Sequence, residues 1–82
     1  MRYAGQLRAA RALLGWNQEM LAESSGVGIA TVRRIEGQSA RIRATSESVW
    51  ALQSALEKAG VVFIPEEEGG SGPGVRLAKT PP

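Results

Sequence analysis

Apolar residues recur at the start of the chain with the spacing of a helix that turns one face inward. Leu7, Ala10 and Leu14 lie three and four positions apart, and Gly15 follows them. This spacing is typical of one apolar helix face, and glycine commonly stands just beyond a helix end. The pattern therefore predicts a first helix that ends at Gly15.

A second, shorter helix is predicted over residues 17–25. Asn17 is a favourable N-cap, because its side-chain oxygen can accept a hydrogen bond from a free N–H of the first turn. The run from Met20 to Ala22 is expected to form the buried side of this helix. Gly26 is expected to end it.

Two further helices are predicted after the glycine-containing turn. In residues 29–36 the expected inward residues are Val32 and Ile35. Thr45 is the expected N-cap of the fourth helix, which Gly60 ends. The inward positions of that helix recur at helical spacing: Val49, Leu52, Leu56 and Ala59.

The pattern changes after the fourth helix. Residues 61–64, VVFI, form a β-branched and aromatic run, and VRLAK at residues 75–79 alternates, with the polar segment EEEGGSGPG between them. We predict two short strands joined by a polar loop. The chain then divides into a helical domain at 1–60, a strand pair at 61–79 and a flexible tail at 80–82.

Positive charge is concentrated in the first half of the chain. Residues 1–45 hold seven arginines against three glutamates, a net charge of +4, whereas residues 46–82 hold three basic residues against five glutamates, a net charge of −2. The first half contains no lysine. A polyanion would be attracted to this arginine-rich half.

The composition excludes several classes of site. Cysteine and histidine are absent from the 82 residues, which excludes thiolate or imidazole zinc sites, haem ligation, cysteine nucleophiles and histidine bases. Glu66, Glu67 and Glu68 are adjacent, so their side chains diverge, and we expect a solvated turn rather than a cation site. The glycines of GGSGPG are followed neither by Lys-Ser/Thr nor by a predicted helix, so no nucleotide loop is expected. We expect no cofactor, no metal and no enzymatic activity.

The apolar residues mark neither a membrane segment nor a ligand site. Apolar runs are only a few residues long, and the N-terminal MRYAGQLRAA lacks the apolar core of a signal peptide, so we expect a cytoplasmic protein. Trp16 and Trp50 stand beside apolar helix positions. Single aromatic residues of this kind usually belong to the core, and we expect both to pack inside.

The stretch NQEMLAESSGVGIATVRRIEG, residues 17–37, joins two predicted helices through a tight turn. In this geometry the first helix can lie across a duplex backbone while the second enters the major groove. Gly26 permits a positive φ in the turn. The spacing within the stretch is specific at six positions: Gln18, Ala22, Gly26, Val27, Val32 and Glu36.

This pattern, Q-x-x-x-A-x-x-x-G-V-x-x-x-x-[VI]-x-x-x-E, resembles that of the helix-turn-helix family of phage Cro and repressor proteins (Cro/C1) and bacterial XRE-like regulators. The resemblance covers residues 6 to about 60. It implies a mainly α, lambda-repressor-like domain of four or five helices, here followed by the short C-terminal β-strand pair. It also implies binding to double-stranded operator DNA, usually as a dimer.

The resemblance also implies roles for individual residues. Gln18 is similar to the residue that bonds a phosphate and braces the groove-reading helix. Arg11 and Glu36 match a structural ion pair between the first and third helices, in which each charge would be costly to bury without the other. The positions that face base edges or the flanking backbone are Gly28, Ile29, Ala30, Thr31 and Arg34.

The side-chain chemistry agrees with these roles. Arginine pairs bidentately with guanine, which discriminates by about 1 to 3 kcal/mol, so Arg34 is our expected base reader. Ile29 and Ala30 suit a thymine methyl group. Arg41 and Arg43 follow the groove-reading helix and are expected to meet phosphates, and Arg33 suits either purpose.

Gly28 is a departure from the family pattern, which more often has Ser or Thr at this position. Glycine costs only a few tenths of a kcal/mol of capping relative to serine, but it supplies no hydroxyl to DNA. The departure bears on the strength of DNA binding more than on the fold.

The first strand suggests a dimer interface. Residues 61–64 show no polar alternation, so we expect both faces to be covered, whereas a lone hairpin covers only one. A homodimer would supply the second cover and would set two groove-reading helices about 34 Å apart. The expected interface residues are Val61, Val62, Phe63 and Ile64.

The sequence thus favours a transcriptional regulator, a repressor of phage or mobile-element type, that binds an inverted-repeat operator as a homodimer with residues 29–36 in the major groove. The alternative is a protein-binding regulator, such as an antitoxin or antiactivator, that uses the same fold as a scaffold for a protein partner. Gly28 favours this alternative, and the four arginines that follow in the third helix and the connector favour DNA.

Overall fold

The structure is a computed structural model that describes residues 1–67 and 70–78. Within these residues four helices are followed by one two-stranded antiparallel sheet, which confirms the mainly α fold with a C-terminal strand pair. The expected tail at 80–82 lies outside the described residues, as do Glu68 and Lys79 of the expected loop and second strand. The elements are α1 (Ala4–Leu14), α2 (Gln18–Ser25), α3 (Ile29–Glu36), α4 (Ser46–Lys58), β1 (Val61–Ile64) and β2 (Gly74–Leu77).

Local hydrogen bonds explain where the helices begin and end. Asn17 Oδ1 accepts from the N–H of Met20 at 2.8 Å, and Thr45 Oγ1 accepts from the N–H of Ser48 at 3.1 Å, so both predicted N-caps are confirmed. Gly15 ends α1 with a φ of 69°, in the left-handed region. Side chains with a Cβ rarely adopt this conformation, which explains the glycine.

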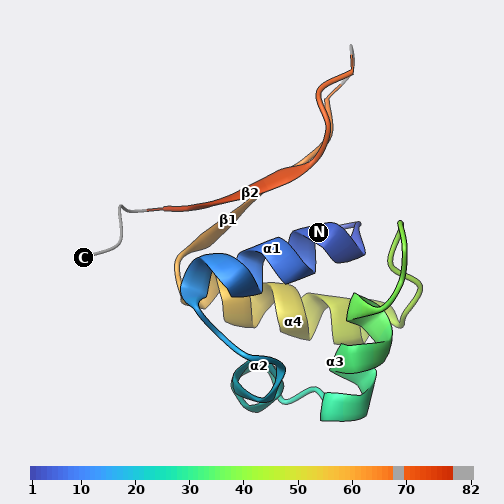
Figure 1. The fold of residues 1–82 in the computed structure, drawn as a ribbon, viewed down its shortest axis with the longest axis vertical. Coiled ribbons are helices and arrows are strands. Elements are labelled where there is room, and N and C mark those ends of the chain that lie inside the picture. The colour runs from blue at the N-terminus through green and yellow to red at the C-terminus, as the bar shows by residue number, and fades with distance from the viewer. Residues whose placement is uncertain (68–69, 79–82) are drawn as a thin grey trace.

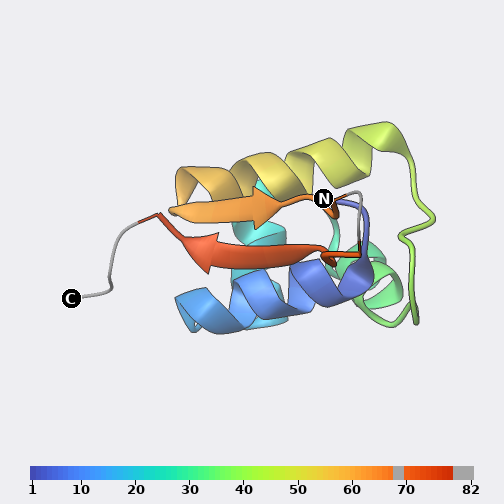
Figure 2. The same ribbon diagram turned by 90° about the horizontal axis from the view of Figure 1, so that it is seen from above.

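The elements form three layers. The hairpin of β1 and β2 lies over α1 and α4, while α2 and α3 lie on their other side (Figure 1). Seen from above, β1 runs beside α4 and β2 beside α1 (Figure 2). The strands pair with Val61 opposite Leu77 and Phe63 opposite Val75. The hairpin therefore leaves the helix-turn-helix pair uncovered.

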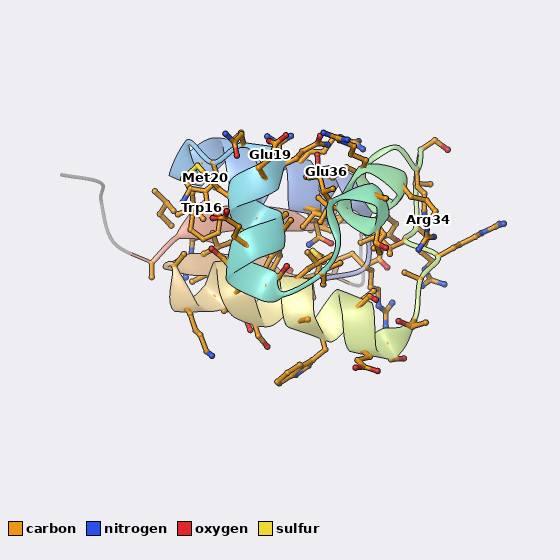
Figure 3. The ribbon with its side chains drawn as sticks, turned by 90° about the horizontal axis from the view of Figure 1, so that it is seen from below. Trp16, Glu19, Met20, Arg34 and Glu36 are labelled. Carbon is orange, nitrogen blue, oxygen red and sulfur yellow. The ribbon has the colours of Figure 1, made fainter. Side chains whose placement is uncertain are left out.

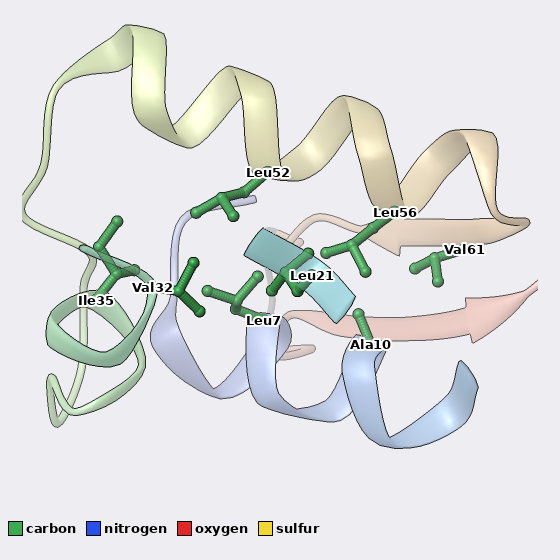
Figure 4. Packing of buried hydrophobic residues seen from close by; sticks show 8 residues of the cluster. All are labelled: Leu7, Ala10, Leu21, Val32, Ile35, Leu52, Leu56 and Val61. Carbon is green, nitrogen blue, oxygen red and sulfur yellow. The ribbon is translucent and has the colours of Figure 1, made fainter. Parts of the chain in front are cut away.

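One hydrophobic cluster joins all of these elements except β2 (Figure 4). The apolar residues of β2, Val75 and Leu77, are partly buried and pack against this cluster. Each helix and β1 contributes at least one fully or nearly fully buried side chain, so the core fixes the placement of α3 relative to α1 and α4. The buried members are Leu7, Ala10, Leu21, Val32, Ile35, Leu52, Leu56 and Val61.

Two residues that we expected inside lie outside. Trp50 is 70% exposed and Met20 is 42% exposed, so both expectations were wrong. Neighbouring positions on a helix point about 100° apart, and a place beside an inward residue is therefore no sign of burial. In α2 the fully buried residue is Leu21, and in α4 the inward side is held by Leu52 and Leu56. Trp16, by contrast, packs against the core cluster.

A buried glutamine ties the N-terminal segment to the hairpin. Gln6, only 6% exposed, donates through Nε2 to the carbonyl oxygens of Ile64 at 3.3 Å and Gly74 at 3.2 Å. Its Oε1 accepts from the N–H groups of Arg2 and Tyr3. Every donor and acceptor of the amide therefore has a partner, which burial requires. None of the helices within the described ranges has the length and apolar character needed to cross a membrane.

Candidate nucleic-acid interface

The turn between α2 and α3 places the two helices against each other. Gly26 adopts a φ of 76°, and its N–H donates to the carbonyl of Ala22 at 2.9 Å. The N–H of Val27 donates to Ser25 Oγ at 3.1 Å, and the Val27 side chain packs against the core. These contacts hold the turn locally, and the buried Val32 of α3 holds it from the core side.

Glu36, at the end of α3, is the centre of a charged network that joins three helices. Its Oε2 accepts from Arg11 Nε at 2.8 Å, and its Oε1 accepts from Arg11 Nη2 at 2.9 Å. Oε1 also accepts from Gln18 Nε2 at 3.2 Å. The Glu36 side chain is only 4% exposed, so this bidentate pairing is what makes its burial tolerable.

The network also determines the charge of Arg11 and the hydrogen bonds that Arg11 and Gln18 make. The side-chain hydrogen bonding that Arg11 donates to Glu36 raises the pKa of Arg11 above its already high ordinary value, so Arg11 remains charged at any physiological pH. Arg11 Nη1 in addition donates to the carbonyl of Trp16 at 3.0 Å, which anchors the α1–α2 turn. Gln18 uses one amide hydrogen on Glu36, and an amide NH₂ group has a second one available for an external acceptor.

The outer side of this framework carries the residues that the sequence singled out for DNA. They come from the start of α2, the turn, α3 and the segment that follows α3, which we call the connector (residues 37–44). None of them is buried. Gly28, Ala30, Arg33, Arg34, Arg41 and Arg43 are exposed, and Gln18, Ile29 and Thr31 are half-buried.

The arginines of α3 point to different neighbours. Arg33 Nη2 lies 3.3 Å from Glu19 Oε1 of α2, an ion pair with both side chains largely exposed. Arg34 Nη1 instead donates to the carbonyl of Arg43 at 3.4 Å, so its side chain lies beside the connector, as the labelled view from below shows (Figure 3). Arg33 thus has a carboxylate beside it, whereas Arg34 forms no ion pair with any residue that the structure describes.

The connector is an ordered segment pinned to the N-terminal residues. Tyr3 and Arg41 form an isolated antiparallel bridge, in which Ala4 N–H donates to Ala40 O at 3.0 Å and Ile42 N–H donates to Arg2 O at 2.8 Å. The Ile42 side chain packs against the core. Arg41 and Arg43, which flank Ile42 in the sequence, remain exposed.

No pattern in the sequence indicated three polar residues that shape this surface. Arg8 Nη1 donates to the carbonyl of Glu36 and, at 3.3 Å, to that of Gln38, so it caps the end of α3 from α1. The Gln38 amide bonds the main chain of Arg43. Glu19 pairs with Arg33. Arg8 acts 28 or more positions away along the chain, and no spacing rule reveals such a contact.

Gly28 is the N-cap of α3 with ordinary extended angles, φ −61° and ψ 146°, and it offers no side chain to the helix end. A Cβ built at this position meets nothing within 4 Å. The fold therefore does not require glycine here, and a serine or threonine would fit. Apart from the small loss of capping, the glycine affects the groups that this edge presents to a ligand.

A family model described as "Helix-turn-helix" matches residues 7–58. The match begins within α1 and ends at the last residue of α4, so it includes the Glu36 network and the connector but not the hairpin. Comparisons with curated proteins and with solved structures gave no significant match.

Proposed function

Because the chain belongs to the Cro/C1-type (XRE) helix-turn-helix family of DNA-binding domains, we propose that it is a transcriptional repressor that binds an inverted-repeat operator as a homodimer. In this proposal it is of phage or mobile-element type and acts in the cytoplasm. The observation that carries it is the Glu36 network, which holds α3 by its buried side and leaves the opposite side, with Arg33 and Arg34, exposed beside the connector arginines. The family is not known for enzymes, and we propose no catalytic activity.

We assign base reading to α3. Arg34 is the proposed partner of a guanine, and Ile29 and Ala30, at the start of the helix, are the proposed contacts to a thymine methyl group. Arg34 would exchange its 3.4 Å bond to the connector carbonyl for the base. Its neighbour Arg33 is held by Glu19 and serves phosphates or bases only after that ion pair opens.

Phosphate contacts are assigned to both ends of this surface. Gln18 offers its second amide hydrogen at the start of α2, and Gly28 and Thr31 lie at the edge between α2 and α3. At the other end the connector forms a hollow in the surface whose lining includes Arg41 and Arg43. Such contacts add affinity without sequence information.

We propose that the dimer contact lies on the hairpin, on residues that the chain's own core does not already use. Val61 is buried in the chain's own core and Phe63 packs against it. Strand alternation places Val62 and Ile64 on the opposite face, paired with Arg76 and Gly74. We therefore propose that Val62 and Ile64 form the contact with a second copy. This face lies opposite α2 and α3 (Figure 1), so dimerisation would leave them free.

The first experiment is selection of bound duplexes from a random pool at about 150 mM salt, where electrostatics alone bind weakly. Wild type should enrich an inverted repeat, and Arg34→Ala should lose preference at one base pair per half-site. Lys58→Ala removes one exposed positive charge from the end of α4 and is the matched control. Equal base preference in wild type and Arg34→Ala would contradict the base-reading assignment.

The dimer is tested separately by sedimentation equilibrium. Val62→Lys should yield monomers that still fold, because Val62 is not part of the core cluster, and the melting temperature should fall only by the stabilisation that the dimer supplied. Phe63→Glu is a poor probe, since it would disturb the chain's own packing. Dimers of unchanged mass after Val62→Lys, at the same protein concentration, would refute the hairpin interface.

The second candidate is a protein-binding regulator, such as an antitoxin or antiactivator. The observation that favours it is the 70% exposure of Trp50, a side chain that is enriched where proteins meet. Salt separates the candidates. The affinity of a DNA binder falls with a slope of about −0.9 per phosphate contact on a double-logarithmic plot, whereas an apolar protein contact responds little.

A further inference from the structure

Gln38 of the connector makes two hydrogen bonds to the main chain of one residue. Its Nε2 donates to the carbonyl oxygen of Arg43 at 3.0 Å, and its Oε1 accepts from the N–H of Arg43 at 2.5 Å. Paired strands exchange both main-chain groups in the same way at one residue pair. A side-chain amide therefore replaces a strand partner here and closes the segment between Gln38 and Arg43 into a loop.

These two hydrogen bonds, which we call the Gln38–Arg43 clamp, hold the connector together with the N-terminal bridge. On one side the bridge between Tyr3 and Arg41 holds residues 40–42. On the other side Gln38 holds Arg43, and the Gln38 main chain is itself held because its carbonyl accepts from Arg8 Nη1 at 3.3 Å. Gln38 thus holds the main chain of Arg43, which the N-terminal bridge does not bond.

Two arginine side chains depend on this arrangement. Arg43 projects from the clamped residue itself, and Arg34 Nη1 donates at 3.4 Å to the same Arg43 carbonyl that accepts from Gln38. Gln38 also lines the connector hollow together with Arg41 and Arg43. If the two hydrogen bonds between Gln38 and Arg43 broke, the loop could move. Neither the Arg43 side chain nor the carbonyl that accepts from Arg34 would then be held in place.

We propose that Gln38 is a positioning residue for DNA binding, which holds the Arg43 main chain so that the Arg43 side chain is already placed for a phosphate before DNA arrives. This inference rests on the proposed function. Ordering a loop at the moment of binding costs conformational entropy, and a side chain that orders it beforehand removes that cost from the affinity. Gln38 acts through the main chain of Arg43 and touches no phosphate itself.

The test measures binding to a fluorescent duplex of about 30 base pairs of arbitrary sequence at about 50 mM salt, because phosphate contacts are independent of sequence and strongest at low salt. Gln38→Ala should weaken binding roughly five- to tenfold, and the slope against salt should become shallower by about one contact. Gln53→Ala removes a half-buried glutamine of α4 that accepts from the N-terminal ammonium of Met1 at 2.8 Å and makes no hydrogen bond to the connector, and it should change affinity less than about twofold.

Two readouts separate positioning from a direct contact. Amide hydrogen exchange at Arg43 should be slow in wild type and fast in Gln38→Ala, because the substitution removes the acceptor of that N–H. In an Arg43→Ala background, Gln38→Ala should cost less than about threefold, since the side chain that it positions is gone. A full five- to tenfold loss in that background would show a direct contact and overturn the proposal.

The remaining outcomes are equally distinct. If wild type binds the duplex and Arg43→Ala weakens it, but Gln38→Ala binds like wild type, the positioning role is wrong while the proposed function stands. If wild type does not bind DNA even at low salt, the proposed function fails and this inference fails with it.

Discussion

The carboxylate of Glu36 meets the guanidinium of Arg11 through two parallel hydrogen bonds, of 2.8 and 2.9 Å, across the contact between α3 and α1. The same carboxylate accepts from Gln18 at the start of α2. One buried side chain thus connects the helix proposed to read DNA to the two helices that carry it. The exposed residues of α3 depend on this connection for their position.

Glu36→Gln should lower the free energy of unfolding by about 3 kcal/mol, near the lower end for a broken buried pair, because Arg11 retains 24% of its side-chain exposure. The substitution removes the charge that compensates Arg11 while keeping the side-chain shape. Urea denaturation measures the change. Glu23→Gln, an exposed carboxylate of α2, is the control and should cost less than about 0.5 kcal/mol. Equal stabilities of the two variants would mean that the pair contributes no more than a surface ion pair.

Gly26→Ala should destabilise the protein by about 1 to 2 kcal/mol, because Gly26 adopts a φ of 76° that disfavours any Cβ. The cost is conformational rather than steric, since a Cβ built there meets nothing within 4 Å. Thermal and urea unfolding give the measurement. Gly72→Ala is the matched control, because that glycine is also unobstructed and its φ is not positive. A destabilisation at Gly72 as large as at Gly26 would refute the conformational explanation.

The two tryptophans should differ in solvent access. With Trp16→Phe, the remaining Trp50 should emit at long wavelength and be quenched strongly by acrylamide, because it is 70% exposed. With Trp50→Phe, the remaining Trp16 should emit at shorter wavelength and be quenched less, since it packs against the core. Strong protection of Trp50 at concentrations where the protein is monomeric would contradict the fold described for α4.

Trp50→Ala should therefore change the free energy of unfolding by less than about 0.5 kcal/mol. Leu52→Ala, two positions along α4, should cost about 2 to 5 kcal/mol, because Leu52 is fully buried and its truncation leaves a cavity. Urea denaturation of both variants makes the comparison within one helix. A larger loss for Trp50→Ala than for Leu52→Ala is the result that would be inconsistent with this packing.

Glu19→Gln should strengthen DNA binding, because it removes the negative charge that lies 3.3 Å from Arg33. We expect a gain of a few-fold at about 50 mM salt that shrinks as salt rises, since exposed charges are screened. Glu23→Gln makes the same change of net charge one turn further along α2 and controls for the overall charge. If both variants gain equally, net charge rather than the release of Arg33 is responsible.

The sequence predicted the order of elements well for reasons that are local. Asn17 and Thr45 cap their helices through hydrogen bonds to residues three positions away, and Gly15 and Gly26 end helices through their own φ. The β-branched run at 61–64 formed a strand, although its partner begins ten positions later across the loop. The same local reading failed for Met20 and Trp50, because nearness to an apolar residue in sequence does not determine the side of a helix.

Other features could not be predicted from spacing. The motif indicated which residues belong to the helix-turn-helix surface, but not that Arg33 is paired with Glu19 or that Arg34 lies on the connector. The absence of polar alternation in residues 61–64 did not distinguish the face turned to the core from the face with Val62 and Ile64. That distinction depends on the position of the hairpin over α1 and α4 (Figure 2).

The sequence by itself thus determined the helices, their caps, the turn at Gly26 and the family of the domain, because each depends on residues within a few positions of one another. Only the tertiary structure decided which arginines of α3 are paired with a carboxylate and how the connector is held. Those properties depend on contacts such as Arg8 with Glu36 and Gln6 with Gly74, which join residues 28 and 68 positions apart. Such pairs form only after the core has brought α1, α3 and the hairpin together. No pattern within a few neighbouring residues can therefore predict them.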